Sequence, residues 1–313
     1  MARAFVFPGQ GSQAVGMGQA LAEAFAPARE VFEEVDEALQ QNLFRLMVEG
    51  PSDTLTLTEN TQPALMAVSL AVVRVIEREG GVTLADKGAF VAGHSLGEYS
   101  ALAAAGCLEI AAAARLLRQR GAAMQAACPP DVGAMAAVMG LDIEAIEAVA
   151  AEAAQGQVCS AANDNSPNQV VISGHREAVL RAMDLAKEKG GRRSQLLPVS
   201  APFHCALMAP AADVMEEALE GSDLAPPALP LIANVTAAPV TAPSEIRRLL
   251  VQQVTGRVRW RESVLAMQEA GVVQLIELGQ GKVLSGLARR IHPDLEGHPC
   301  GTPEDIEAFL ATL

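Results

Sequence analysis

Short apolar runs alternate with helical segments along this chain, and the alternation predicts an α/β fold. The runs at residues 3–7, 88–92 and 272–278 have the length and apolar character of strands buried in a parallel sheet. Between the first two runs, residues 64–79 form a long apolar helix with Pro63 near its first turn. The pattern therefore predicts parallel strands joined by helices.

A second pattern occupies the middle of the chain. Short strands and helices follow in the order β-α-β-β-α-β, at residues 133–139, 142–154, 158–163, 169–173, 176–189 and 194–199. This is the order of a ferredoxin-like unit. The sequence Asp-Asn-Ser-Pro at 164–167 predicts the turn between its two middle strands. We therefore expect a small subdomain inserted in a larger α/β domain.

The stretch Gly93-His94-Ser95-Leu96-Gly97 connects a predicted strand to a helix rich in alanine and leucine. A G-x-S-x-G spacing between strand and helix is that of the nucleophile elbow, which exposes a serine hydroxyl at the top of a parallel sheet. The helix N-terminus then faces negative charge that develops beside the serine. Ser95 is therefore the candidate nucleophile, with a plain glycine-rich turn as the alternative.

A serine nucleophile needs a base, and the chain has five histidines. His204 lies at a strand-loop-helix junction where the large domain resumes, in the kind of loop where α/β sites collect, and is the preferred candidate. His94 is expected beside the serine without acting as its base, and His175, His292 and His298 at a helix cap or on the surface. Since no acidic residue after His204 stands out, a carbonyl oxygen could hold its imidazole.

Arg120 belongs to a predicted helix at residues 110–127 that is rich in alanine, leucine and methionine. An arginine that points inward could grip a substrate carboxylate with a bidentate fork, whereas Arg115 and Arg118 are expected in solvent. An inward Arg120 would distinguish a carboxyacyl transferase from a simple esterase.

The loop at residues 8–13 contains Gly9-x-Gly11, which fits part of a dinucleotide fingerprint. That fold needs a second strand ending in an acidic residue about 20 positions later. Residues 28–39 show helical spacing instead. We expect the loop to present backbone N–H groups toward Ser95.

Composition narrows the function classes. The 313 residues carry a net charge of −14, which argues against nucleic acid as a partner. No apolar run approaches the roughly 20 residues of a membrane helix, and the first residues lack a signal-peptide pattern. The five cysteines are scattered without C-x-x-C spacing, which indicates a reducing cytoplasm and argues against a metal site.

An ordered set of motifs runs from the first strand to about residue 290. The motifs are Phe7-Pro-Gly-Gln-Gly-Ser-Gln13, Thr61-Gln-Pro-Ala64, Gly93-His-Ser-Leu-Gly-Glu98, Gln119-Arg-Gly121, Asn165-Ser-Pro167, Pro202-Phe-His204 and Gly279-Gln-Gly-Lys282. Together they resemble the malonyl-CoA:acyl carrier protein transacylases of type II fatty acid synthesis. The resemblance implies an α/β-hydrolase-like large domain with a parallel sheet, residues 1–129 and 198–313, and a ferredoxin-like small subdomain, residues 130–197.

The resemblance also implies roles for individual residues. Ser95 would be the nucleophile and His204 the general base. The backbone N–H groups of Gln10 and Leu96 would form the oxyanion hole, and Arg120 would bind the malonyl carboxylate. Gln253 would hold the histidine with a carbonyl, with Gln252 as the alternative. Phe203 resembles the bulky residue of malonyl-selective acyltransferase domains, where it crowds an α-methyl branch.

The implied reaction is ping-pong, with malonyl-CoA as donor and the phosphopantetheine thiol of acyl carrier protein as acceptor, and it needs no cofactor. The family's carrier protein is acidic, so a chain at −14 needs a local positive surface. The candidates are Lys282 with Arg289 and Arg290, and Lys187 with Lys189, Arg192 and Arg193. We expect a cytoplasmic monomer.

Two other functions compete with the transferase. A hydrolase of the esterase or thioesterase type would not depend on Arg120 and would transfer the acyl group readily to water. A non-catalytic carrier-docking protein of the same fold would tolerate the loss of Ser95.

Overall fold

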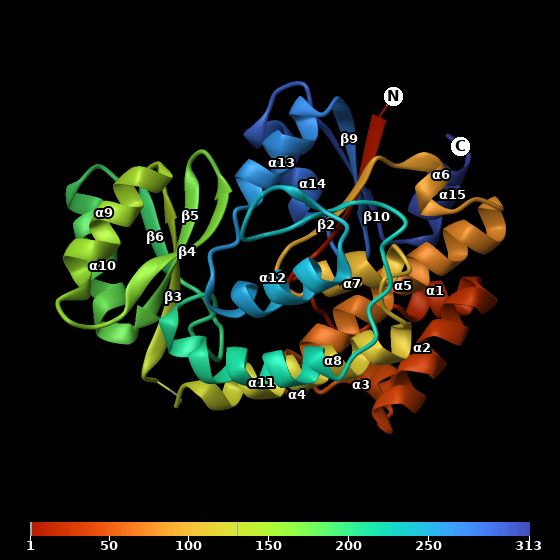
Figure 1. Cartoon of the computed structure of the whole chain (residues 1–313), viewed down its shortest axis with the longest axis horizontal. Coiled ribbons are helices and arrows are strands. Elements are labelled where there is room, and N and C mark those ends of the chain that lie inside the picture. Colours follow the sequence, from red (N-terminus) through yellow and green to blue (C-terminus); the bar gives the residue numbers. More distant parts are fainter. Residues whose placement is uncertain (1, 130) are drawn as a thin grey trace.

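The computed structural model describes residues 2–129 and 131–313, which form two sheets (Figure 1). The larger sheet has six strands in the order β10-β9-β1-β2-β7-β8, and neighbours are parallel except β7 with β8. Its strands are β1 (Ala2–Phe7), β2 (Phe90–Gly93), β7 (Leu231–Ile232), β8 (Pro239–Val240), β9 (Val272–Leu278) and β10 (Glu296–Cys300). The predicted α/β fold with a parallel sheet is confirmed.

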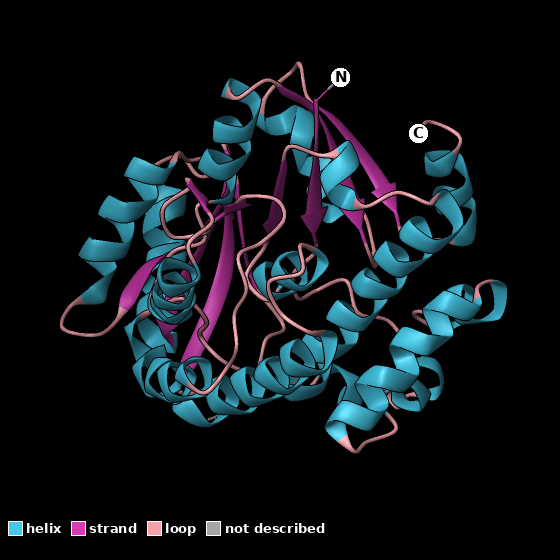
Figure 2. Ribbon diagram, turned by 45° about the vertical axis from the view of Figure 1, so that its right-hand side comes forward, coloured by secondary structure: helices cyan, strands magenta, loops and turns pink. Residues whose placement is uncertain are grey.

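Helices cover both faces of this sheet (Figure 2). The helices outside the smaller sheet's part of the chain, some on the sheet and some packed on other helices, are α1 (Gln19–Ala24), α2 (Ala26–Leu39), α3 (Leu43–Glu49), α4 (Ser52–Thr56), α5 (Thr58–Gly80), α6 (Leu84–Lys87), α7 (Gly97–Ala104), α8 (Ile110–Ala127), the 3₁₀ turn η1 (Ala206–Met208), α11 (Ala209–Glu220), α12 (Pro243–Thr255), α13 (Trp260–Glu269), α14 (Val283–Ile291) and α15 (Pro303–Leu310). On β1, Phe5 and Phe7 enter a core shared with α2, α5 and α8, whereas Ala4 and Val6 enter a second core with α13 and α14. This period-2 alternation between two apolar cores is typical of a strand buried on both faces.

The smaller sheet is antiparallel, with the order β4-β5-β3-β6, and lies to one side of the larger one (Figure 1, green). Its elements are β3 (Gly133–Met139), α9 (Ile143–Ala154), β4 (Cys159–Ser166), β5 (Gln169–His175), α10 (Arg176–Glu188) and β6 (Arg193–Leu196). The order and pairing are those of a ferredoxin-like unit. The domain boundaries stay a prediction, and Pro130, where the predicted insertion begins, lies outside the described residues.

The turn between β4 and β5 comes later than the sequence predicts, because β4 continues to Ser166. The strand is held on its other side by the large domain. The backbone N–H of Val258 donates to the Ala162 carbonyl, and the N–H of Asp164 donates to the Val258 carbonyl, both at 2.9 Å. The buried Asp164 carboxylate also pairs with Arg261 at 2.9 Å. These contacts join β4 to the start of α13 in the other part of the chain.

Helix α5 begins earlier than predicted, so Pro63 lies inside the helix instead of near its first turn. The polar residues 54–61 predict a loop or a short helical turn, and the structure places them in the short helix α4 and the first turn of α5, where Thr58, Asn60 and Thr61 are buried. Their polarity is satisfied internally, as when the Thr61 hydroxyl donates to the Leu55 carbonyl at 2.7 Å. A polar segment such as 54–61 can therefore be helical and partly buried when its side chains find hydrogen-bond partners within the fold.

Candidate active site

Ser95 lies two residues after the end of β2, in the turn into α7. Its φ of 55° lies in the left-handed region, which residues other than glycine rarely adopt. A methyl group on Gly93 would overlap the backbone of Gly97, and one on Gly97 would overlap the carbonyl of Phe7. The chain can make this sharp turn because both positions lack a side chain.

The fold brings His204 to Ser95 from 109 residues away. Its Nε2 lies 2.8 Å from the Ser95 hydroxyl. Its Nδ1 lies 2.8 Å from the backbone carbonyl oxygen of Gln253 and 3.1 Å from that of Gly256. Because carbonyl oxygens only accept, Nδ1 carries the proton and Nε2 accepts from the serine.

The environment of His204 keeps its imidazole neutral. Burial, followed by the positive charge of Arg120, lowers the pKa of His204 from 6.5 to about 3, against the opposing effect of the carbonyls at Nδ1. A neutral imidazole in contact with a hydroxyl is the state that can take its proton.

Arg120 points inward from α8 and is 1% exposed. It donates to Gln62 Oε1 and Gln253 Oε1, each at 2.8 Å, and to the Ser95 hydroxyl at 3.1 Å. The other two arginines of α8 differ from it: Arg115 is exposed and Arg118 is half-buried. The three groups that accept these hydrogen bonds are neutral, so the buried guanidinium keeps its positive charge beside the candidate nucleophile. An anion that reached this position would be bound strongly.

Ser95 lies in a cavity of about 480 Å³. Gln10 and Leu96, the residues predicted to form an oxyanion hole, line the same cavity. Part of the wall is apolar and includes Met124 and Phe203. The cavity thus combines a serine, a neutral base and a cation with apolar surface.

An adjoining cavity of about 400 Å³ shares Gln10 and His94 with the first. Lys282 and Arg290 line it, whereas Arg289 lies outside it and pairs with an exposed carboxylate on β10. The second predicted basic group is exposed on the small subdomain and consists of Lys187, Lys189, Arg192 and Arg193. Only the first group therefore reaches the cleft that leads to Ser95.

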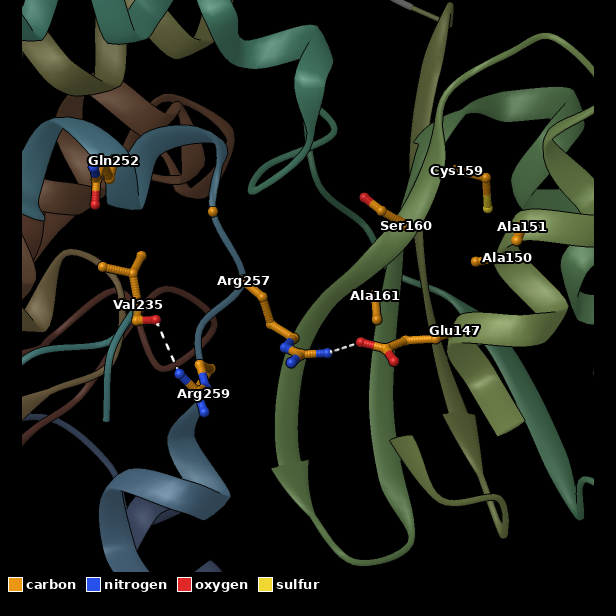
Figure 3. A pocket seen from close by; sticks show the side chains of 11 residues that line it. Glu147, Ala150, Ala151, Cys159, Ser160, Ala161, Val235, Gln252, Arg257 and Arg259 are labelled. Atoms are coloured by element: carbon orange, nitrogen blue, oxygen red, sulfur yellow. Dashed lines mark hydrogen bonds and ion pairs between the residues drawn. The ribbon is translucent and has the colours of Figure 1, made fainter. Parts of the chain in front are cut away.

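A third cavity, of about 590 Å³, lies between the small subdomain and the segment from 252 to 259, and shares no lining residue with the Ser95 cavity (Figure 3). Arg257 reaches across it to an ion pair with Glu147. Gln252 lines this cavity. Of the two glutamines that the sequence left open, it is Gln253 whose carbonyl contacts His204.

Within the described residues, His204 is the histidine whose ring nitrogen lies within hydrogen-bond distance of the Ser95 hydroxyl, and the other four have other surroundings. His94 shares a hydrogen bond of 2.9 Å with Asn165 Oδ1, and burial lowers its pKa. His175 precedes α10 and accepts from a backbone N–H at 2.9 Å. His292 is half-buried and His298 is exposed.

Sequence reasoning missed three polar residues that support the site, namely Gln62, Glu98 and Asn234. Asn234 accepts from the Ser95 N–H at 2.9 Å and donates to the Gly93 carbonyl at 2.7 Å, so it fixes the elbow. Asn234 has a signal in the sequence, because a lone polar side chain within an apolar segment has to find a partner on burial. Gln62 and Glu98 have other polar residues beside them, so this signal does not single them out.

In the described ranges 2–129 and 131–313, no group of three or more His, Cys, Asp or Glu residues is placed to hold a metal ion. The helices of these ranges also include none with the length and apolar character needed to cross a membrane.

Comparison with known proteins shows the family to which the chain belongs. The acyl transferase domain family matches residues 4–285. The chain belongs to this family, which confirms the resemblance seen in the sequence. Among its relatives, the malonyl CoA-acyl carrier protein transacylase of Escherichia coli (strain K12) is 46% identical over 307 residues, 98% of each chain. That of Bacillus subtilis (strain 168) is 44% identical over 311 residues, 99% of this chain and 96% of the relative.

Solved structures are similar over the whole chain. The acyl-carrier-protein-S-malonyltransferase from Bartonella henselae has a TM-score of 0.97 at 54% identity, covering 100% of this chain and 99% of the other. A malonyl-transacylase in complex with its type II PKS acyl-carrier protein has a TM-score of 0.96 at 43% identity, covering 100% of both chains.

Proposed function

We propose that this chain transfers a malonyl group from malonyl-CoA to the phosphopantetheine thiol of an acyl carrier protein. One observation carries the proposal: the buried guanidinium of Arg120 lies 3.1 Å from the Ser95 hydroxyl, which lies 2.8 Å from the imidazole of His204. An acyl group bound to Ser95 would therefore place a free carboxylate beside a buried cation. The relatives named malonyl CoA-acyl carrier protein transacylases support the same substrate pair.

In the first half-reaction, the Ser95 oxygen attacks the thioester carbonyl while Nε2 of His204 takes the hydroxyl proton. The N–H groups of Gln10 and Leu96 stabilise the oxyanion of the tetrahedral intermediate. The intermediate collapses to the malonyl ester of Ser95, and the CoA sulfur leaves with the proton held by His204. Gln253 keeps Nδ1 protonated throughout with its backbone carbonyl.

In the second half-reaction, the thiol of the carrier protein gives its proton to His204 and attacks the carbonyl carbon of the ester. The Ser95 oxygen leaves as the tetrahedral intermediate collapses, and His204 returns the proton to it. The thiol reaches Ser95 through the cleft between the proposed large domain (1–129 and 198–313) and the proposed small subdomain (130–197). Met135 and Leu197 line the Ser95 cavity from the small subdomain side. Lys282 and Arg290 lie where a phosphate or an acidic partner would meet the cleft.

Intact mass after brief incubation with malonyl-CoA tests the proposal. The wild type should gain one malonyl adduct that holo carrier protein discharges. Ser95→Ala should gain none, because the adduct is an ester of that hydroxyl. Arg120→Ala should lose malonyl acylation while acetyl acylation persists, since only the malonyl group has a carboxylate to bind.

Two results would contradict the transferase. Absence of an adduct on the wild type would leave a non-catalytic carrier-binding protein. An adduct lost to water as fast as to carrier protein would indicate a hydrolase.

A further inference from the structure

Glu98 is a buried carboxyl group that the reaction above does not use. It lies on the first turn of α7, three residues after Ser95, and is 2% exposed. It does not line the cavity of Ser95. One carboxyl oxygen accepts the backbone N–H of Asn234 at 2.6 Å, and the other accepts from the side-chain amide of Gln253.

The neighbours of Gln253 fix the orientation of its side-chain amide. Arg120 can only donate, so the oxygen of the amide faces Arg120. The amide nitrogen then donates to the Ser95 carbonyl at 2.8 Å and to Glu98. Turning the amide over would place its NH₂ group against the guanidinium, which also only donates.

Both oxygens of Glu98 therefore act as acceptors, which is the hydrogen-bonding pattern of an ionised carboxylate. Burial raises the pKa of Glu98 to about 8, so the ionised form dominates only above about pH 8; the hydrogen bonds from Asn234 and Gln253 and the charge of Arg120 favour that form and keep the pKa from rising further. A glutamine in place of Glu98 would turn its NH₂ group toward either the Asn234 backbone N–H or the Gln253 NH₂ group, and both of these can only donate.

We propose that Glu98 is a positioning residue for acyl selection: its carboxylate orients the Gln253 amide, and that amide aims the Arg120 guanidinium at the carboxylate of the acyl group. This inference rests on the proposed function, because it concerns the carboxylate that Arg120 would bind. Asn234 donates its backbone N–H to the same carboxylate, and a glutamine at position 98 could still accept this bond with its amide oxygen, so the contact of Asn234 with the Ser95 backbone is preserved in that variant.

Single-turnover acylation of Glu98→Gln by malonyl-CoA and by acetyl-CoA tests the proposal. The malonyl rate should fall about tenfold to a hundredfold, the effect of losing a hydrogen bond to a charged group. The acetyl rate, which needs no carboxylate binding, should fall less than about threefold. In an Arg120→Ala background the Glu98→Gln change should not lower the residual malonyl rate any further, because Glu98 acts on malonyl binding only through Arg120.

Glu277→Gln is the matched control. Glu277 is also fully buried and accepts from backbone N–H groups at the start of α14, so the variant loses a comparable contact without touching Arg120. It should leave the ratio of malonyl to acetyl rates unchanged, whatever it does to thermal stability.

Parallel losses of malonyl and acetyl rates in Glu98→Gln would overturn the proposal, as would an additive effect in the Arg120→Ala background. If Glu98→Gln does not fold, Gln253→Leu breaks the same connection with Glu98 in place, and an unchanged malonyl preference there would be equally contrary. A wild type that takes acetyl but no malonyl would instead contradict the proposed function itself.

Discussion

The backbones of Ser95 and His204 both adopt positive φ angles, at 55° and 57°. Each such conformation costs roughly 1–3 kcal/mol and persists only where the surroundings impose it. Asn234 imposes it at the serine through the Ser95 N–H, and the Gln253 and Gly256 carbonyls hold the histidine side chain. At the scale of single residues, the site is preorganised before any substrate binds.

The lowered pKa of His204 predicts how acylation depends on pH. Because burial and the Arg120 charge lower this pKa to about 3, the imidazole remains an unprotonated base well below its ordinary pKa of 6.5. The kcat/KM for Ser95 acylation by malonyl-CoA should therefore stay flat between about pH 5 and pH 7. Removing the positive charge in Arg120→Ala should raise the pKa of His204. As the pH is lowered, the rate of acylation by acetyl-CoA should therefore begin to fall at a higher pH in this variant than in the wild type.

The measurement is a pH series of single-turnover acylation rates on both proteins, with folding at each pH checked by circular dichroism. A wild-type midpoint near the ordinary histidine pKa would contradict the predicted environment of His204.

At the scale of elements, the elbow depends on the close approach of three backbones. Gly97, at the start of α7, packs on the carbonyl end of β1 at Phe7, and Gly93 at the end of β2 packs on Gly97. The distance between strands and helix is thus set by two residues without side chains, and the height of the serine above the sheet follows from it.

Gly97→Ala should lower the free energy of unfolding by about 3 kcal/mol, the upper range for overpacking, because its methyl group would meet the Phe7 carbonyl. Gly286→Ala is the control, since a methyl group within α14 there meets nothing within 4 Å. It should stabilise the protein by roughly 0.5–1 kcal/mol. Urea unfolding of the two variants beside the wild type measures both values, and equal stabilities would contradict this account of the elbow.

The sequence predicted the elements with many buried apolar residues well, as at β1, β9 and α8. It did not predict β8, β10 and α15, in which few side chains are buried. It also singled out Ser95, His204 and Arg120, whose residue types have distinct chemistry. Glu98 and Asn234 escaped because their importance depends on contacts between residues more than 130 positions apart.

At the scale of the whole molecule, the net charge is negative but the edge of the cleft carries positive side chains. The chain carries −14, yet Lys282 and Arg290 are exposed at the cleft that leads to Ser95. An acidic partner would be repelled by the molecule at long range and attracted at this edge. Such local complementarity sets the orientation of an encounter more than its affinity.

Arg290→Glu should raise the KM for holo carrier protein roughly three- to tenfold, since it replaces attraction at the cleft with repulsion. Arg45→Glu, an equal charge change on the exposed face of α3, should leave that KM unchanged. The measurement is a steady-state titration with holo carrier protein at saturating malonyl-CoA. The docking prediction would be wrong if the two variants behaved alike.

Gln253 performs its two tasks with different parts of one residue, since its carbonyl contacts His204 and its side chain contacts Arg120. Every amino acid has a backbone carbonyl, so a mutation at position 253 can change the orientation of the Arg120 side chain while His204 keeps its hydrogen-bond acceptor. Descendants of this gene could therefore drift toward other acyl groups through position 253 without passing through an inactive ancestor.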